Sequence, residues 1–198
     1  MSSEYCGPLP LSSKLNKSRY NEVYNLCVDN IDNLAKEGKI APGISTVQKS
    51  GKTGLTNKKN SCFVNCILQA LMNTKDFITL YTSKRISNYV NAKNQHGSQG
   101  ALSACLSAYS NAYWSKKYAV LNTNLFLDII SRFVRSDFDG INEKDSNEFL
   151  IWILWKLAED VKKDSIELGA NQKNYSGLIK DNGKKDFFFF GFLLWISS

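Results

Sequence analysis

Hydrophobic side chains recur along most of the chain with the three-to-four-residue spacing of amphipathic helices. This spacing predicts one helix over residues 18–37, and Gly38 supplies a stop. A second helix is predicted over residues 62–72, where apolar side chains follow positions i, i+3, i+4 and i+7 of one face. Asn60 or Ser61 is expected to cap this second helix.

Three further helices are predicted in the second half of the chain. One covers residues 101–116, with a single apolar side, and another starts at Asn122 or Thr123. Asp145 and Glu148 have the spacing of a capping box, which predicts a helix directly behind Asp145. The chain is therefore expected to be mainly α.

The two ends of the sequence differ from the predicted helical region. Residues 1–17 are polar, contain proline and serine, and are expected to form a loose lead-in. Residues 187–196 form an apolar segment, which is too short to cross a bilayer because a spanning helix needs about 20 residues. We expect this segment to be a buried strand, and we expect no membrane partner.

Composition and charge narrow the classes of protein. Of the 198 residues, 43% are hydrophobic and 12% aromatic, so the chain can form a core and is not typical of disordered proteins. The net charge of +7 is compatible with an anionic partner. However, the basic residues are spread along the chain without a recognisable binding module, so we expect no nucleic acid partner.

The five cysteines do not form a recognisable framework. Their number is odd and no CxxC pair occurs, which argues against a disulfide scaffold and against a four-ligand zinc site. No metal ion or other cofactor is expected. The N-terminal residues lack the pattern of a secretory signal, so a reducing cytoplasmic or nuclear setting is expected.

Candidate chemistry lies at the start of the second predicted helix. Cys62 follows a polar loop directly, and the positive end of a helix stabilises a thiolate. Asn57, five residues earlier, has a side-chain amide that can donate a hydrogen bond to an oxyanion. The pattern indicates acyl transfer by a cysteine nucleophile; the alternative is a small buried packing residue. Cys66, one turn later, is expected to be a packing residue.

Two sequence boxes resemble a known family. Residues 54–77, GLTNKKNSCFVNCILQALMNTKDF, resemble the Cys box of the ubiquitin-specific proteases, which are papain-like deubiquitinating cysteine peptidases. Residues 143–157, EKDSNEFLIWILWKL, resemble the family's Gln-Gln-Asp-type box. The two boxes occur in the family's order, and the resemblance covers about residues 50–160.

The resemblance implies a role for several residues. Cys62 resembles the nucleophile that attacks the carbonyl of the C-terminal glycine of ubiquitin, and Asn57 resembles the oxyanion-hole donor. Asp145 resembles the residue that holds the extended ubiquitin tail. Phe149 and Leu150 resemble core residues of the helical thumb subdomain. The implied partners are ubiquitin or ubiquitinated proteins.

The sequence also departs from the family pattern. The family's Leu-Gly pair before the cysteine is replaced by Lys58 and Lys59, and the single histidine, His96, lies between the boxes rather than in a late His box. His96 is expected to be a solvated loop residue. The resemblance thus implies that residues 18–198 are a partial catalytic domain, the thumb, with the palm and fingers missing. Two alternatives stay open, namely a deubiquitinase that is incomplete in this chain and a catalytically inactive ubiquitin-binding or scaffold fragment; the oligomeric state is left open too.

Overall fold

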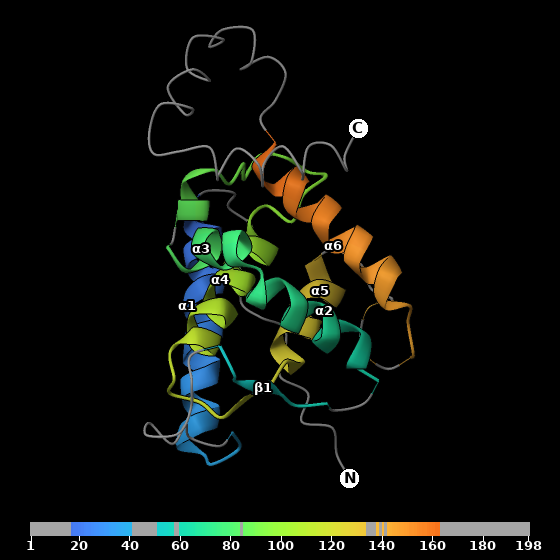
Figure 1. Cartoon of the computed structure of the whole chain (residues 1–198). Coiled ribbons are helices and arrows are strands. Elements are labelled where there is room, and N and C mark those ends of the chain that lie inside the picture. The colour runs from blue at the N-terminus through green and yellow to red at the C-terminus, as the bar shows by residue number, and fades with distance from the viewer. Residues whose placement is uncertain are drawn as a thin grey trace, which may run out of the picture.

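Helices make up most of the described part of the computed structural model, which comprises residues 17–40, 51–57, 60–83, 85–133, 138, 140 and 142–162. The predicted mainly α fold is confirmed (Figure 1). The helix starts predicted at residues 18, 62 and 101 and directly behind Asp145 agree with the structure to within one residue, whereas the helix predicted from Asn122 or Thr123 begins at Asn124. The elements are, in order, α1 (Lys17–Lys36), β1 (Gly54–Leu55), α2 (Cys62–Asn73), α3 (Lys75–Thr82), the 3-10 helix η1 (Arg85–Asn88), α4 (Ala101–Trp114), β2 (Val120–Leu121), α5 (Asn124–Phe133) and α6 (Ser146–Val161).

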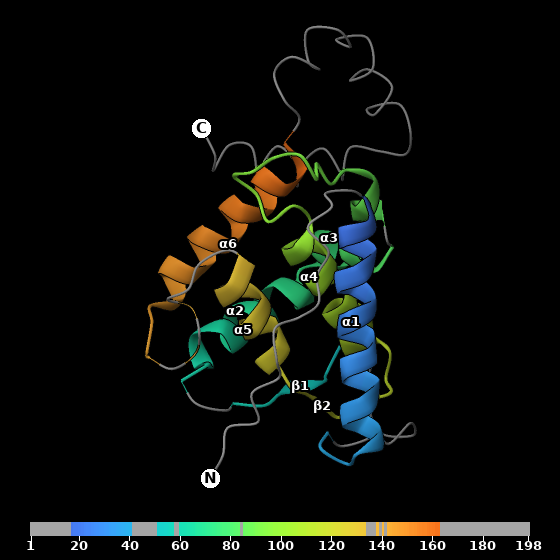
Figure 2. The ribbon, with the colours of Figure 1, turned by 180° about the vertical axis from the view of Figure 1, so that it is seen from behind.

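Helix α4 is the central element of the fold. The sequence predicted one apolar side, but every residue from Ala101 to Ser110 is buried. The reason is that most of these side chains are small, so that α1, α3, α5 and α6 can all pack against α4. Figure 2 shows α1 lying along α4. Two hydroxyl groups of this interior form hydrogen bonds to neighbouring helices: Ser107 accepts a hydrogen bond of 2.8 Å from Tyr20, and Ser103 donates one of 2.9 Å to Asp160.

Asp160, near the end of α6, is fully buried and holds the loop that precedes α4. Its carboxylate accepts hydrogen bonds from the Ser98 N–H at 2.5 Å, the Ser98 hydroxyl at 2.7 Å, the Ser103 hydroxyl at 2.9 Å and the Gly100 N–H at 3.3 Å. It thereby lies at the positive N-terminal end of α4. Burial raises the pKa of Asp160 above its usual range, and the hydrogen bonds from Ser98 and Ser103 oppose that shift. The carboxylate joins α6 to α4.

A short parallel strand pair fixes the segment that leads into α2. Gly54 pairs with Val120, and Leu55 pairs with Leu121. The sequence prediction placed strand character only near the end of the chain and missed these strands, since two residues are too few to show an alternating pattern. The predicted strand at residues 187–196 and residues 1–16 of the predicted lead-in at residues 1–17 lie outside the described residues, and Lys17 is the first residue of α1.

None of the helices in the described part of the chain combines the length and the apolar composition that crossing a bilayer requires.

Candidate active site around Cys62

Cys62 is the first residue of α2, and its side chain is exposed. The alternative that Cys62 is a buried packing residue is therefore wrong. The first hydrogen bonds of the helix run from the N–H groups of Val64 and Asn65 to the carbonyl of Ser61, at 3.1 and 3.0 Å. The N–H groups of Cys62 and Phe63 precede this ladder, so they add to the positive end of the helix at the thiol.

Ser61 stands at the N-cap position of α2 but does not cap it with its side chain. Its buried hydroxyl instead donates a hydrogen bond of 3.0 Å to Oδ1 of Asn57, which corrects the expectation of a side-chain cap from Asn60 or Ser61. The backbone N–H of Asn60 donates to the carbonyl of Gly140 at 3.0 Å. Because Oδ1 of the exposed Asn57 faces Ser61, the Nδ2 group is the end of the amide that can donate elsewhere.

Two polar side chains of α2 hold the loop that carries Asn57. The buried Asn65 donates from Nδ2 to the carbonyl of Thr56 at 2.9 Å and accepts a hydrogen bond of 3.0 Å from the Thr123 hydroxyl. Gln69 donates from Nε2 to the carbonyl of Thr53 at 3.2 Å. These bonds run on the α2 side of the loop, and the β1–β2 pairing holds its other side. The position of Asn57 relative to Cys62 is thus fixed by several independent contacts.

An aromatic cluster joins the start of α2 to the start of α6. Ring centroids of Phe63 and Phe149 lie 5.5 Å apart in an edge-to-face arrangement, and Phe138 lies 5.9 Å from Phe63 and 4.9 Å from Trp152. The structure confirms Phe149 as a core residue, whereas Leu150 is half-buried. Sequence reasoning missed Phe138, which lies between the predicted helix that starts at Asn122 or Thr123 and the one behind Asp145. The only signal was one phenylalanine among polar neighbours.

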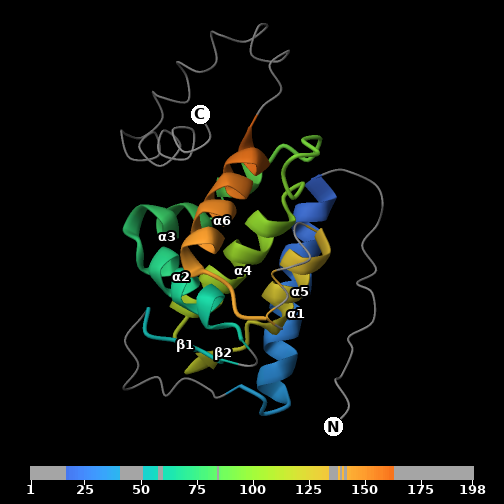
Figure 3. The same cartoon turned by 90° about the vertical axis from the view of Figure 1, so that its right-hand side faces the viewer.

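Asp145 is the N-cap residue of α6, as its spacing to Glu148 predicted. Its Oδ1 atom accepts a hydrogen bond of 2.6 Å from the Asn147 N–H, and the side chain is exposed. The aromatic contact between Phe63 and Phe149 brings the two helix starts together, and Figures 1 and 3 show α6 lying against α2. Cys62 and Asp145 therefore sit at adjoining N-terminal ends of two packed helices.

His96 lies at the other end of α6. It is exposed, which confirms the expectation of a solvated loop residue, and its carbonyl accepts a hydrogen bond from Lys156. The same loop is bound to the end of α6 by Asn94, whose Nδ2 donates to the Glu159 carbonyl at 2.8 Å. A helix of 16 residues is about 24 Å long. The structure therefore does not bring His96 to Cys62.

The remaining described cysteines fall into two kinds. Cys66 is exposed and donates from Sγ to the Phe63 carbonyl at 3.2 Å, so its expected role as a packing residue is wrong. Cys27 of α1 and Cys105 of α4 are buried free thiols with their sulfur atoms 3.5 Å apart. Burial raises the pKa of the Cys105 thiol well above its usual range. Among the described residues, no three potential metal ligands lie together.

Comparison with known proteins identifies the family. Residues 53–187 match the model of the family described as ubiquitin carboxyl-terminal hydrolase. The chain belongs to this family. The matched range contains Asn57, Cys62 and Asp145, and the described helices form a mainly α, thumb-like portion of a ubiquitin carboxyl-terminal hydrolase domain.

Individual relatives carry the same family name. The chain is 26% identical to ubiquitin carboxyl-terminal hydrolase 15 of Xenopus tropicalis over 181 residues, which cover 90% of the chain and 18% of that protein. It is 33% identical to the putative ubiquitin carboxyl-terminal hydrolase 11 of Arabidopsis thaliana over 116 residues, 59% of the chain and 13% of that protein. The chain thus spans less than a fifth of the length of either relative.

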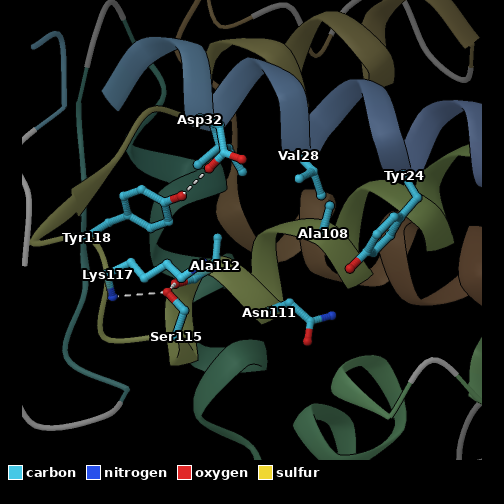
Figure 4. Close-up of a pocket in the computed structure, with 10 residues that line it drawn as sticks. Tyr24, Val28, Asp32, Ala108, Asn111, Ala112, Ser115, Lys117 and Tyr118 are labelled. Atoms are coloured by element: carbon cyan, nitrogen blue, oxygen red, sulfur yellow. Dashed lines mark hydrogen bonds between the residues drawn. The ribbon is translucent and has the colours of Figure 1, made fainter. Parts of the chain in front are cut away.

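A hollow on another part of the surface lies between α1 and α4 (Figure 4). Its volume is about 250 Å³, and Tyr24, Asp32, Asn111 and Tyr118 contribute polar atoms to its lining. The Tyr118 hydroxyl donates to Asp32 at 2.6 Å, and burial together with this bond raises the pKa of Tyr118 to about 12. None of its lining residues comes from α2 or α6, so this hollow is separate from the candidate active site.

Proposed function

We propose that this chain supplies the nucleophile and the substrate-holding groups of a cysteine-type ubiquitinyl hydrolase. The activity is thiol-dependent cleavage of peptide and isopeptide bonds after the C-terminal glycine of ubiquitin. One observation carries the proposal, namely the exposed Cys62 thiol at the first residue of α2, within the range that matches the hydrolase family. The partners are ubiquitin or ubiquitinated proteins, in a cytoplasmic or nuclear setting where thiols stay reduced.

Cys62 acts as the nucleophile of a two-step hydrolysis. Its thiolate, at the N-terminal end of α2, attacks the glycine carbonyl carbon. A C–S bond forms, the C–N bond to the leaving amine breaks, and the amine takes up a proton. Water then attacks the thioester, which releases the ubiquitin carboxylate and restores the thiol.

Asn57 donates from Nδ2 to the oxyanion that forms beside the sulfur. The hydrogen bond from Ser61 to Oδ1 supports this assignment, because it holds the amide oxygen away from the developing negative charge. Loss of one oxyanion donor typically lowers kcat by about 10²–10³-fold. Asn57→Ala is therefore expected to lower turnover by this amount in the complete hydrolase domain without a comparable change in substrate binding.

Asp145 holds the extended tail of ubiquitin by accepting backbone N–H groups. Its Oδ1 atom caps α6, which leaves the second carboxylate oxygen for the substrate. Asp145→Asn tests this role well, since asparagine caps a helix about as well as aspartate. The variant is expected to keep the stability of the wild type and to bind ubiquitin more weakly. An unchanged affinity for ubiquitin in this variant would limit Asp145 to its capping role.

The general base must come from outside the described site. The only histidine of the chain lies at the far end of α6, and the absence of a general base lowers the rate by about 10²–10⁴-fold. We therefore expect residues 1–198 alone to give no measurable turnover of a fluorogenic ubiquitin substrate. The position of His96 also favours a second candidate function, a catalytically inactive ubiquitin-binding or scaffold fragment.

A ubiquitin probe with an electrophilic C-terminus tests the proposal. In the complete hydrolase domain the probe is expected to label the wild type and the Cys66→Ala variant and to spare Cys62→Ala. The Cys66 variant is the matched control, because both thiols are exposed on α2. Labelling of Cys66, or no labelling despite ubiquitin binding, would remove Cys62 as the nucleophile, and the second result favours the inactive binding fragment. Turnover by residues 1–198 at ordinary enzyme rates would refute the inference that this chain lacks the general base.

A further inference from the structure

The outward face of α6 carries large apolar side chains that the fold does not cover. Ile151 is 55% exposed and Trp155 is 37% exposed, and these are the exposed large hydrophobic side chains of the described residues. They are four residues apart, so they are neighbours on one helix face. With Glu148 and Trp152 they line a hollow of about 260 Å³. We name Ile151, Trp152 and Trp155 the α6 apolar face.

The Trp155 ring already has a cation–π contact within the chain before any partner binds. The Lys156 ammonium nitrogen lies 4.8 Å from the centroid of the ring, and it also donates to the His96 carbonyl. A side chain fixed in advance loses little conformational freedom on binding. The face is therefore better suited to docking than a pair of freely rotating side chains.

The inner face of α6 is packed, so the outward side chains are not needed by the described core. Phe149, Ile153 and Leu157 are buried, and α6 contacts both α2 and α4. Figure 1 shows α6 at the edge of the helical body. Adjoining exposed apolar side chains around a hollow are typical of an interaction surface.

The same chain contains a segment with matching chemistry. Residues 187–196 read FFFFGFLLWI, and nine of these ten residues are apolar. Leaving so many large apolar side chains in water is unfavourable, so the segment needs an apolar surface to cover it. Flat aromatic and branched aliphatic side chains are the kind that fill a hollow lined by tryptophan and isoleucine.

The length of the connection allows the segment to reach the face. Residues 163–186, 24 in number, separate the last described residue from the segment. A connection of this length can span at most about 80 Å, because each residue adds at most about 3.3–3.6 Å. Ile151 lies about 15 Å from the C-terminal end of α6. A connection that can bridge the two sites favours an intrachain contact over association with a second molecule.

We propose that residues 187–196 dock on the α6 apolar face of the same chain. This contact goes beyond the hydrolase function, because it needs neither the Cys62 thiol nor ubiquitin. It covers the side of α6 that faces away from α2 and α4.

Photo-crosslinking of the full 198-residue chain tests the contact. A benzophenone amino acid replaces Ile151, and the same amino acid at the exposed Asn33 of α1 serves as the control. The expected product is a crosslink within one chain from position 151 to a peptide of residues 187–196, with no such product from position 33. A crosslinked dimer, a link from position 151 to another segment, or no link would overturn the proposal.

Proteolysis gives an independent readout that does not require the crosslinker. Chymotrypsin cleaves after the aromatic residues of the segment, and docking slows this cleavage. Ile151→Lys is expected to raise the cleavage rate within residues 187–196 at least fivefold, while Asn33→Lys leaves the rate unchanged. Both substitutions are at exposed positions, so the folded body stays intact. Equal rates in the wild type and Ile151→Lys would contradict the proposed contact.

Discussion

Replacing Asp160 by alanine tests how the thumb-like helices are joined. The substitution removes the acceptor of two N–H groups and two hydroxyl groups from Ser98, Gly100 and Ser103, in a region without solvent. Each buried donor left without an acceptor costs about 1–3 kcal/mol, while the unfavourable burial of a carboxylate is relieved. We expect a net loss of about 3–5 kcal/mol from the free energy of unfolding, which is typically about 5–15 kcal/mol for a domain.

Chemical denaturation followed by circular dichroism measures this loss, with two variants for comparison. Asp160→Asn keeps one acceptor oxygen and is expected to lose less than half as much as Asp160→Ala. Asp29→Ala removes an exposed carboxylate from α1 and is expected to change the stability by less than about 0.5 kcal/mol. A loss below about 1 kcal/mol in Asp160→Ala, on the scale of an ordinary surface change, would refute the assigned role of the carboxylate.

The difference in stability between the wild type and Asp160→Asn is expected to change with pH in a defined direction. Burial raises the pKa of Asp160 in the folded state above the value of about 3.9 that an unfolded aspartate has. Between these two values the folded state binds the proton more tightly than the unfolded state does, so stability falls as the pH rises. The stability of the wild type relative to Asp160→Asn is therefore expected to be highest below about pH 4 and to decrease through the raised folded pKa.

Two further predictions concern other parts of the fold. Under native conditions iodoacetamide is expected to alkylate Cys62 at least tenfold faster than Cys27 and Cys105, because the latter two are fully buried. Mass spectrometry of proteolytic digests measures the alkylation rates. Equal rates would contradict the packing of α1 on α4. Since burial and Asp32 raise the folded pKa of Tyr118 to about 12, its contribution to stability is expected to disappear between about pH 10 and pH 12. Denaturation of the wild type and Tyr118→Phe at pH 9 and pH 11 measures this; parallel losses in both proteins would count against it.

The sequence predicted the helices of the site because their signals are local. The apolar spacing after Cys62 and the cap at Asp145 lie within a few residues of the helix starts that they mark. The structure also shows what such signals do not reveal. The Ser61 hydroxyl donates a hydrogen bond to Asn57 and does not cap the helix N–H groups. The position of Ser61 before the helix does not predict which of the two bonds forms.

Contacts between distant residues could not be predicted from one sequence. The buried carboxylate of Asp160 pairs with Ser98, more than sixty residues earlier, and neither residue belongs to a motif. Phe138 joins an aromatic cluster although its neighbours are polar. The sequence of α4 predicts only one apolar side, although the helix is packed on every side, because its small and polar side chains do not mark the other buried faces. In each case the partner, rather than the local pattern, determines the structure.

The bond from the Asn60 N–H to the Gly140 carbonyl has a consequence for synthesis of the protein. The ribosome adds Gly140 about 80 residues after Asn60, which at about 5–20 residues per second is a delay of roughly 4–16 s. During this interval the nascent chain already contains the Cys62 thiol but does not yet contain Gly140, whose carbonyl binds the Asn60 N–H next to the thiol. Translation that stops before residue 140 therefore yields a polypeptide that has the Cys62 thiol but lacks the Gly140 carbonyl that binds the loop beside it.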